Sequence, residues 1–207
     1  MQTVHMTDEG ARSAAAASLR AGGVIVVPTD TVYGLAALPD DAGAVARIYA
    51  AKNRPDRIHL PVLAATLDHV RRLGVAFPQA AVTLSSLWWP GPLTMAFGFS
   101  ATAARPDWLI GRDEVAVRIP DDAFLLALMR DVGPLVVTSA NRHGDATPPS
   151  AEEAGSRLAP YVSLVIDGGV LDTVPSTLVN MRTSPPVVER EGAITRRAIS
   201  AALEGPP

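Results

Sequence analysis

The sequence predicts a mixed fold of the α/β or α+β class, built on a mixed sheet. Short apolar runs of strand length recur along the chain, between segments with helical spacing and helix caps. Several of these strands follow one another without a helix between them, whereas a regular doubly wound sheet alternates strictly. No linker, low-complexity tract or internal repeat divides the 207 residues, so we expect one domain over residues 1–207.

The helices are predicted from start and stop signals. An alanine-rich segment that ends at Gly22-Gly23 predicts the first helix. Side chains able to accept a hydrogen bond from a first turn, at Asp40-Asp41, Asp121-Asp122 and Ser150, predict where three others begin. Ser150 is followed three positions later by Glu153, as in a capping box. The predicted helices are residues 8–21, 41–51, 67–73, 78–88, 122–130, 150–158 and 195–203.

The strands are predicted from short apolar runs, at residues 24–27, 60–64, 93–99, 115–119, 135–138, 162–166, 177–179 and 187–189. The first run leads directly into residues 28–35, a turn that is dense in hydroxyls and also carries a carboxylate and a phenol. Polar side chains directly after a strand are where open α/β sheets build ligand sites. This turn is therefore the first candidate for function.

Composition and charge exclude several classes of function. With 18 basic and 21 acidic residues the formal net charge is −3. A protein whose main task is to bind nucleic acid usually carries a net positive charge, so the sequence argues against that class. The absence of cysteine excludes disulfides, thiolate catalysis and cysteine-type zinc sites. The four histidines lack metal-ligand spacing, so we expect no metal site made of protein ligands. A Mg²⁺ ion that enters with a nucleotide is a separate matter.

The sequence has no recognisable targeting segment. The N-terminus lacks a basic stretch followed by an apolar one, and the longest apolar runs are far short of a membrane span. We therefore expect a cytoplasmic protein without a membrane partner.

Two polar clusters follow predicted elements. Lys52 and Arg54 lie at the end of a predicted helix, where they either complement the helix dipole or clamp a phosphate. Ser139 and Asn141 follow the strand 135–138, where they either satisfy their own turn or project into a shared crevice. The spacing alone leaves both alternatives open.

Arg118 stands inside the otherwise apolar strand 115–119. A buried guanidinium needs a partner, because burial of an unpaired charge is costly. That partner is either an Asp or Glu of the protein or an anionic group of a ligand, and the sequence favours neither. Ser176 and Arg190 near the C-terminus have ordinary explanations when taken alone, in turn chemistry and a surface ion network.

The familiar nucleotide and hydrolase motifs are missing from the sequence. It contains no GxxxxGK[ST] phosphate loop, no GxGxxG fingerprint and no GxSxG elbow. A nucleotide would therefore have to be held by scattered cations and hydroxyls.

Taken together, the clusters resemble those of the YrdC/TsaC family, the threonylcarbamoyladenylate synthases. Seven matching stretches occur in the family's order and cover nearly the whole chain. They are GVIVVPTDTVYGL at 23–35, KNRP at 52–55, WPGPLT at 89–94, VAVRIP at 115–120, PLVVTSAN at 134–141, DGG with ST at 167–169 and 176–177, and REG at 190–192. The chain stops soon after the last stretch, which resembles the short, single-domain form of the family.

The resemblance implies an open, twisted α/β sheet with a concave substrate cleft. It implies a nucleotidyltransferase that makes threonylcarbamoyl-AMP from L-threonine, bicarbonate and ATP, with Mg²⁺ accompanying ATP and pyrophosphate released. Other proteins then use the product to modify a tRNA adenosine, and some members of the family also bind tRNA or double-stranded RNA. The reaction requires no protein nucleophile, because the N-carboxylate of threonine attacks the α-phosphate and the enzyme holds two anions together.

The resemblance also implies roles for individual residues. The implied catalytic residues are Lys52, Arg54 and Arg118. The implied threonine contacts are Thr31, Tyr33, Arg118, Val137 and Ser176, with Tyr33 shaping the pocket and Val137 offering its backbone. The implied ATP contacts are Lys52, Arg54, Ser139, Asn141, Thr147 and Arg190.

Three positions depart from the family's pattern. Ile58 stands where relatives have an asparagine, and Leu63 stands where a histidine is expected, which removes polar contacts from the ATP lid and the threonine pocket. Glu114 stands near the nucleotide, where relatives often carry a smaller hydroxyl residue. Its carboxylate would repel phosphates unless magnesium or an arginine intervenes.

A second hypothesis is an RNA-binding paralogue of the same fold that lacks synthase activity. The acidic balance of the chain and the intact pairs Lys52/Arg54 and Ser139/Asn141 favour the synthase over this alternative.

Overall fold

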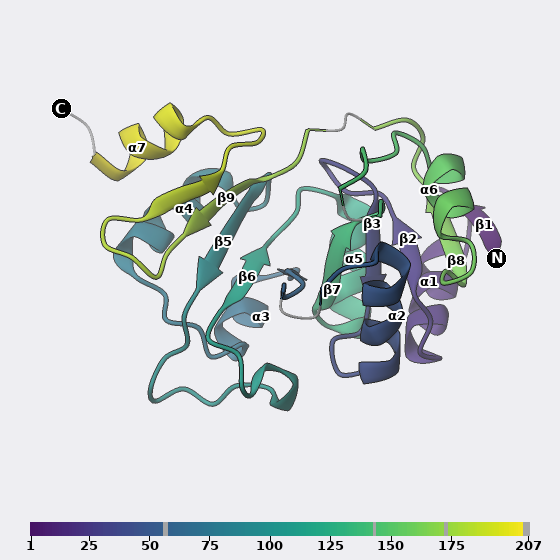
Figure 1. Cartoon of the computed structure of the whole chain (residues 1–207), viewed down its shortest axis with the longest axis horizontal. Helices are drawn as coiled ribbons and strands as arrows, with labels where there is room; N and C mark the ends of the chain where they lie inside the picture. Colours follow the sequence, from purple (N-terminus) through teal and green to yellow (C-terminus); the bar gives the residue numbers. More distant parts are fainter. Residues whose placement is uncertain (56–57, 143, 172–173, 205–207) are drawn as a thin grey trace.

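The computed structural model describes residues 1–55, 58–142, 144–171 and 174–204. Their strands form one ten-stranded sheet in the order β1-β8-β2-β3-β7-β4-β6-β5-β9-β10. Figure 1 shows the sheet running along the long axis of the molecule, with β1 at one end and α7 at the other. Parallel and antiparallel pairs both occur in it, so the predicted mixed α/β fold is confirmed.

The strands are short, and most were expected from their apolar runs. They are β1 Gln2–His5, β2 Ile25–Val27, β3 Gly34–Ala37, β4 Val62–Leu63, β5 Leu93–Phe97, β6 Val115–Arg118, β7 Leu135–Ser139, β8 Leu164–Asp167, β9 Thr177–Asn180 and β10 Val187–Arg190. The pairs β1·β8, β2·β8, β4·β6 and β5·β9 are parallel, and the other neighbours are antiparallel.

Three of the described helices begin where the capping side chains predict. The helices are α1 Ala11–Arg20, α2 Ala42–Lys52, α3 Leu67–Arg72, α4 Gln79–Trp88, α5 Ala123–Val132, α6 Ala151–Leu158 and α7 Arg196–Glu204, with a 3-10 turn η1 at Asp107–Leu109. Asp41, Asp122 and Ser150 each accept a hydrogen bond from a first-turn N–H group, which confirms three predicted caps.

Two strands, β1 and β3, were not predicted. The sequence of β3 is Gly-Leu-Ala-Ala, which has little of the β-branched or aromatic character that marks a strand. It is nevertheless fully buried in the middle of the sheet, between β2 and β7. A Cβ atom at Gly34 would lie 2.6 Å from Cγ1 of Val137, so the glycine allows the two backbones to pair.

The core lies on both faces of one half of the sheet and on one face of the other half. Helices α1 and α5 pack together on one face, whereas α2 and α6 belong to the cluster on the opposite face (Figure 1). Around β5 and β6, only the face that packs against α4 and α7 is filled. Strand residues alternate between two faces, so the opposite side chains of these strands are left to form a hollow.

Within the described ranges, no helix combines the length and the apolar character that crossing a membrane needs.

Candidate active site

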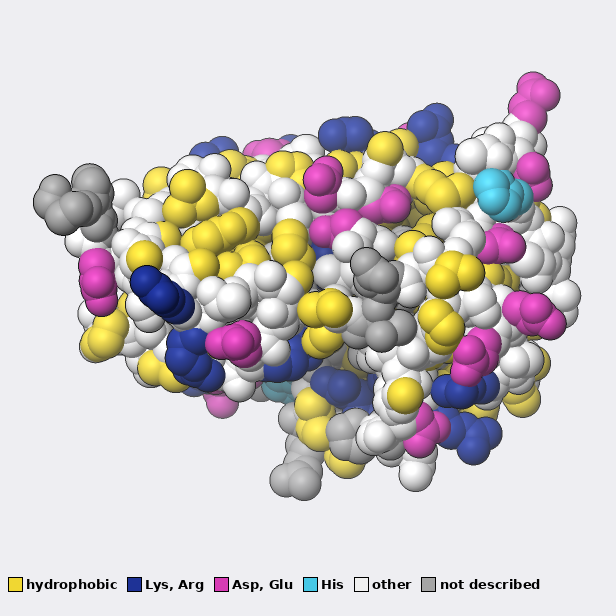
Figure 2. All heavy atoms as spheres, turned by 90° about the horizontal axis from the view of Figure 1, so that it is seen from above, with side chains coloured by type: hydrophobic (Ala, Val, Ile, Leu, Met, Phe, Trp, Pro, Cys, Tyr) yellow, Lys and Arg dark blue, Asp and Glu magenta, His cyan; other side chains and the backbone are white. Residues whose placement is uncertain are grey.

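A cleft of about 620 Å³ lies on the unfilled face of the sheet. Figure 2 shows a recess near the centre of the view, with basic side chains inside it, as expected from the arginines of the lining. The sequence-predicted residues that line the cleft are Thr31, Arg54, Arg118, Val137, Ser139, Thr147, Ser176 and Arg190. Residues from distant parts of the chain therefore meet in one place.

The floor of the cleft follows from the strand period of two. On β6 the side chains of Glu114, Ala116 and Arg118 face the cleft, while Val115 and Val117 are buried in the core. Cross-strand pairing aligns Ala96 of β5 with Ala116 of β6. Two alanines side by side leave room over the middle of the floor.

Arg118 is the most buried cation of the cleft lining, with 5% of its surface exposed. Its guanidinium donates to the Gly91 carbonyl at 2.9 Å, to Oγ1 of Thr31 at 2.8 Å, and to the Asp30 carboxylate. Asp30 is the acidic partner that the sequence left open. Arginine carries five N–H groups, so two have no partner among the described residues and are available to a ligand.

Thr31 is positioned by its own turn. Oγ1 of Thr29 accepts hydrogen bonds from the N–H groups of Thr31 and Val32, both at 3.1 Å, and donates to the Val32 carbonyl at 2.7 Å. This closed arrangement is a hydroxyl turn of the kind that follows strands. It holds the Thr31 hydroxyl against Arg118 at the cleft wall.

Ser176 and Arg190 form the opposite wall. The Arg190 guanidinium donates to the Ser176 carbonyl at 2.8 and 3.1 Å, and Oγ of Ser176 lies 2.8 Å from Oγ1 of Thr94. The pKa of Arg190 is lowered by partial burial and by the charge of Arg118. The two guanidinium groups therefore both contribute positive potential to the same part of the cleft, which favours an anionic ligand.

Lys52 does not belong to the described lining of the cleft. It is 2% exposed, and its ammonium donates to the backbone carbonyls of Ser139 and Asn141, the latter at 2.6 Å. Burial, and secondarily the charge of Arg54, lowers the pKa of Lys52 to about 8. Direct contact with ATP stays a prediction, because in this structure Lys52 supports the turn that follows β7.

Asn141 also differs from the expectation of a side chain in the crevice. Its Nδ2 donates at 2.8 Å to the carbonyls of Arg142 and of Asp145, so the amide closes the loop after β7. Its Oδ1 is buried without a partner among the described residues. Of the predicted pair, only Ser139 lines the cleft.

Arg54 lines the cleft and bonds the backbone at Ile58 and His59, shortly before β4. Its Nε donates to the Ile58 carbonyl at 2.9 Å, and NH2 donates to the His59 carbonyl at 3.0 Å. Ile58 itself lines the cleft with an apolar side chain, as the departure from the family pattern requires. Residues 56 and 57, between Arg54 and Ile58, lie outside the described residues.

Tyr33 is not a wall of the cleft. The ring is fully buried, its hydroxyl donates to the Gly169 carbonyl at 2.6 Å, and it accepts from the Gly168 N–H at 3.0 Å. The expectation that Tyr33 shapes the threonine pocket is therefore corrected: it fixes the turn after β8 instead. Val137 does line the cleft, but its backbone N–H already donates to the Pro61 carbonyl at 3.0 Å.

The remaining two departures, Glu114 and Leu63, both line the cleft. Leu63 is 5% exposed in β4 and presents an apolar surface where a histidine was expected. The Glu114 carboxylate forms an ion pair with Arg182. An arginine therefore does intervene at Glu114, although Arg182 was absent from every predicted set.

Several lining residues carried no signal in the sequence. Glu189 is polar, but a single acidic residue in an edge strand is common. Asp30, the partner of Arg118 outside the lining, is likewise a single acidic residue in a turn. The small residues Ala96 and Ala116 look like ordinary strand positions. The lining residues that were missed are Thr29, Val32, Gly34, His59, Leu60, Pro61, Thr94, Ala96, Ala116, Thr138, Pro175, Leu178 and Glu189.

The fold and the cleft define a mixed α/β protein with an arginine-lined cleft on one face of its sheet. Residues 17–192 match the model of the Sua5/YciO/YrdC family, whose description reads "Telomere recombination". The chain belongs to this family.

Known relatives resemble the chain over most of its length. The threonylcarbamoyl-AMP synthase of Bacillus subtilis is 37% identical over 191 residues, which are 91% of this chain and 55% of the relative. The enzyme of that name from Halorhodospira halophila is 36% identical, with 88% and 92% covered. The chain thus spans about half the length of the first relative and most of the second.

The fold also matches a solved structure of the family. The crystal structure of Pyrococcus abyssi Sua5 complexed with L-threonine superposes with a TM-score of 0.87 at 33% identity. The match covers 97% of this chain and 60% of that one.

Proposed function

We propose that this chain is a transferase that makes threonylcarbamoyl-AMP from L-threonine, bicarbonate and ATP, with release of pyrophosphate. The observation that carries the proposal is the meeting of Arg54, Arg118 and Arg190 in one cleft. A reaction that joins two anions needs such preorganised positive charge. The names of the relatives and the L-threonine bound to Pyrococcus abyssi Sua5 support the same reaction.

The threonine end of the cleft would be the wall around Arg118. The two N–H groups left over on its guanidinium suit a carboxylate, which arginine binds with directional, charge-assisted hydrogen bonds. The Thr31 hydroxyl lies against Arg118 in this wall, and the Ser176 hydroxyl lies in the opposite wall. They can hydrogen-bond the polar groups of a small amino acid.

The triphosphate would lie among Arg54, Ser139, Thr147 and Arg190. Lys52 adds positive charge beneath the loop that carries Ser139. We propose that Mg²⁺ enters with ATP, since this ion is usually held by phosphate oxygens and water with few protein ligands. With this assignment the chain is a nucleotidyltransferase.

The proposed chemistry balances without a covalent enzyme intermediate. The threonine amine takes up bicarbonate and loses water, which gives an N-carboxylate. An oxygen of that carboxylate then bonds to the α-phosphorus of ATP, the bond to the bridging oxygen breaks, and pyrophosphate leaves. The cleft residues orient both reactants and offset the charge that develops on the phosphate.

We further propose that the product passes to proteins that transfer it to a tRNA adenosine. The product is a reactive mixed anhydride, so a protein that accepts the threonylcarbamoyl group must take it up from this cleft or from solution.

The test is incubation with L-threonine, bicarbonate, Mg-ATP and pyrophosphatase, with phosphate release and product mass as readouts. Release that requires both threonine and bicarbonate is expected, and Arg118→Met should abolish it. Arg12→Met, which removes an exposed ion pair with Asp131 outside the cleft, is the matched control. Release that ignores threonine and bicarbonate rejects the proposal, and salt-dependent RNA binding without ATP affinity would favour the RNA-binding paralogue.

A further inference from the structure

The cleft has two electrically different ends. Arg118 stands at one end of β6 and Glu114 just before the other, about 13 Å apart along the strand. Arg190 lies near the row of Arg118: the register of β5 and β6, continued by one residue, places Thr94 beside Arg118, and pairing aligns Thr94 with Leu178 and Leu178 with Arg190. Arg118 and Arg190 therefore lie at the other end of the floor from Glu114.

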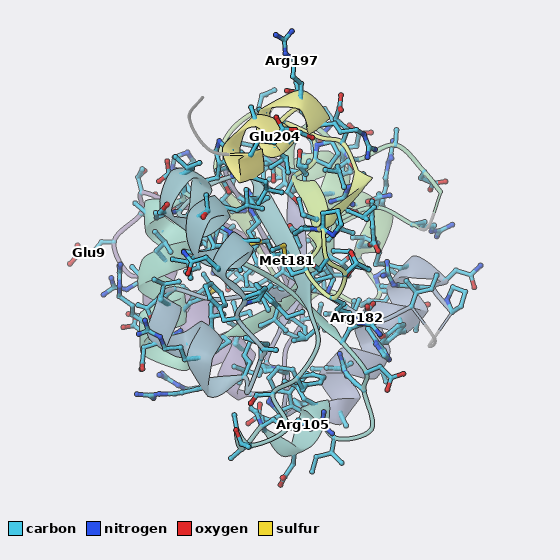
Figure 3. The ribbon with its side chains drawn as sticks, turned by 90° about the vertical axis from the view of Figure 1, so that its left-hand side faces the viewer. Glu9, Arg105, Met181, Arg182, Arg197 and Glu204 are labelled. Carbon is cyan, nitrogen blue, oxygen red and sulfur yellow. The ribbon has the colours of Figure 1, made fainter. Side chains whose placement is uncertain are left out.

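The Glu114 carboxylate is held in place from the next hairpin. Oε2 is bound by NH1 of Arg182, which follows the end of β9, while Oε1 has no partner in the described ranges. Both side chains are 41% exposed. Figure 3 shows Met181 and Arg182 in the half of the molecule that carries α7. Met181 is buried, whereas Arg182 is turned outward, toward Glu114.

A second cleft carboxylate is tied to the same hairpin. Oε1 of Glu189 accepts from Nδ2 of Asn180 at 2.7 Å, and Oδ1 of Asn180 accepts from the Arg182 N–H at 2.8 Å. Asn180 and Arg182 therefore connect the two acidic residues of the lining. Each carboxylate keeps one oxygen without a partner among the described residues, so each can still accept a hydrogen bond.

The space between the two ends fits an uncharged, partly apolar group. Ala96, Ala116 and Leu178 face it, and none of them carries a polar side chain. The carboxylate oxygens at the Glu114 end accept hydrogen bonds, so they suit a group with hydroxyl donors better than an ionised phosphate, which has only acceptors. Carboxylates bind ribose hydroxyls in this way in dinucleotide-binding folds.

We propose that Glu114, positioned by Arg182, is a specificity-determining residue that accepts hydrogen bonds from the ribose hydroxyls of the nucleotide. This inference rests on the proposed function, and it specifies how ATP lies in the cleft. The nucleoside lies at the Glu114 end, over Ala96 and Ala116, and the phosphates lie toward Arg54 and Arg190. Arg182 is a positioning residue, since it acts through the carboxylate.

The test compares equilibrium binding of a nonhydrolysable ATP analogue with binding of its 2′-deoxy and 3′-deoxy forms, measured by calorimetry. A hydrogen bond to a charged acceptor is worth a factor of about ten to a hundred, so the wild type should prefer the ribose form of the analogue by about that factor. Glu114→Ala should lose the preference, and Arg182→Met should weaken it. Glu153→Ala breaks the equally exposed ion pair with Arg157 outside the cleft and should keep it.

The outcomes separate this inference from the function on which it rests. If Glu114→Ala binds the ATP analogue and keeps the wild-type preference for ribose, the ribose assignment is wrong. It is equally wrong if this variant binds all three nucleotides more tightly by one factor, because the carboxylate then only repels phosphate. If the wild type binds none of them, the proposed function itself fails.

Discussion

Arg118 and Asp30 form a buried ion pair in the wall of the cleft, with side-chain exposures of 6% and 12%. The pair answers a question that the sequence leaves open, because a protein carboxylate balances the guanidinium inside an apolar strand. The guanidinium still borders the cleft. Asp30 therefore fixes the orientation of Arg118 without using all of its hydrogen-bonding capacity.

The first prediction concerns Asp30→Asn. Removing one partner of a buried pair leaves a charge without compensation, so we expect a loss of about 3–5 kcal/mol in unfolding free energy, together with weaker threonine binding. Urea unfolding and threonine titration measure the two effects. The control is Asp68→Asn, whose exposed i,i+4 pair with Arg72 should be worth less than about 1 kcal/mol. Equal losses in both variants would contradict a structural role for Asp30.

The second prediction concerns the pH dependence of nucleotide binding. Burial lowers the pKa of Lys52 to about 8, and a bound triphosphate stabilises the charged form, which raises that pKa again. Above pH 8 the free protein carries Lys52 mostly deprotonated, so nucleotide binding is coupled to uptake of a proton by Lys52. Affinity for a nonhydrolysable ATP analogue should therefore fall, as the pH rises, by up to about tenfold per pH unit. Calorimetry between pH 7 and 9.5 tests this.

The variant Lys52→Met serves as the reference for that titration. It should bind more weakly at pH 7 and lack the fall above pH 8, since the ammonium group whose protonation is coupled to binding is gone. A fall of the same steepness in Lys52→Met would assign the pH dependence to another group.

Elements with strong local signals were the predictable part of the fold. The caps at Asp41 and Ser150 and the apolar run before the first polar turn fixed their elements, because the determinants are adjacent in the sequence. β3 was not predictable in this way. Its residues 34–37 have weak strand propensity, and only its place between β2 and β7 makes it a strand.

The sequence predicted which polar residues lie at or near the candidate site. It did not predict whether each side chain points into the cleft or toward the neighbouring backbone. Lys52, Asn141 and Tyr33 lie near the cleft, yet their polar atoms bond the backbone of neighbouring turns. Motif spacing specifies which residues come near a site. It does not specify whether a side chain faces the ligand or the loop behind it, since that depends on long-range pairing.

The third prediction follows from the position of Tyr33. Tyr33→Phe removes the hydroxyl that joins the Gly168 N–H and the Gly169 carbonyl, so we expect about 1–3 kcal/mol of destabilisation. Because the ring does not line the cleft, the KM for threonine should stay at its wild-type value. A raised KM with unchanged stability would show that Tyr33 contacts the substrate after all.

The fourth prediction concerns Thr177, a fully buried residue next to the cleft residue Ser176. Its hydroxyl donates to the Ile194 carbonyl at 2.5 Å and accepts from the N–H groups of Gly192 at 2.9 Å and Ile194 at 3.0 Å. These bonds hold the turn after β10 against β9. Gly192 lies so close to this strand that a Cβ atom there would be 2.2 Å from the Pro175 carbonyl oxygen.

Thr177→Val keeps the shape of the side chain but leaves those three backbone groups without a partner, at a cost of about 2–4 kcal/mol in unfolding free energy. Arg190, which reaches the Ser176 carbonyl from the end of β10 just before this turn, should then lose its fixed position, so ATP-analogue affinity should fall as well. Thr177→Ser retains the hydroxyl and should retain the affinity, because only a methyl group is lost. Urea unfolding and calorimetry on all three proteins separate the two effects. Wild-type affinity in folded Thr177→Val would mean that the turn is held by its backbone packing and that the hydroxyl does not position Arg190.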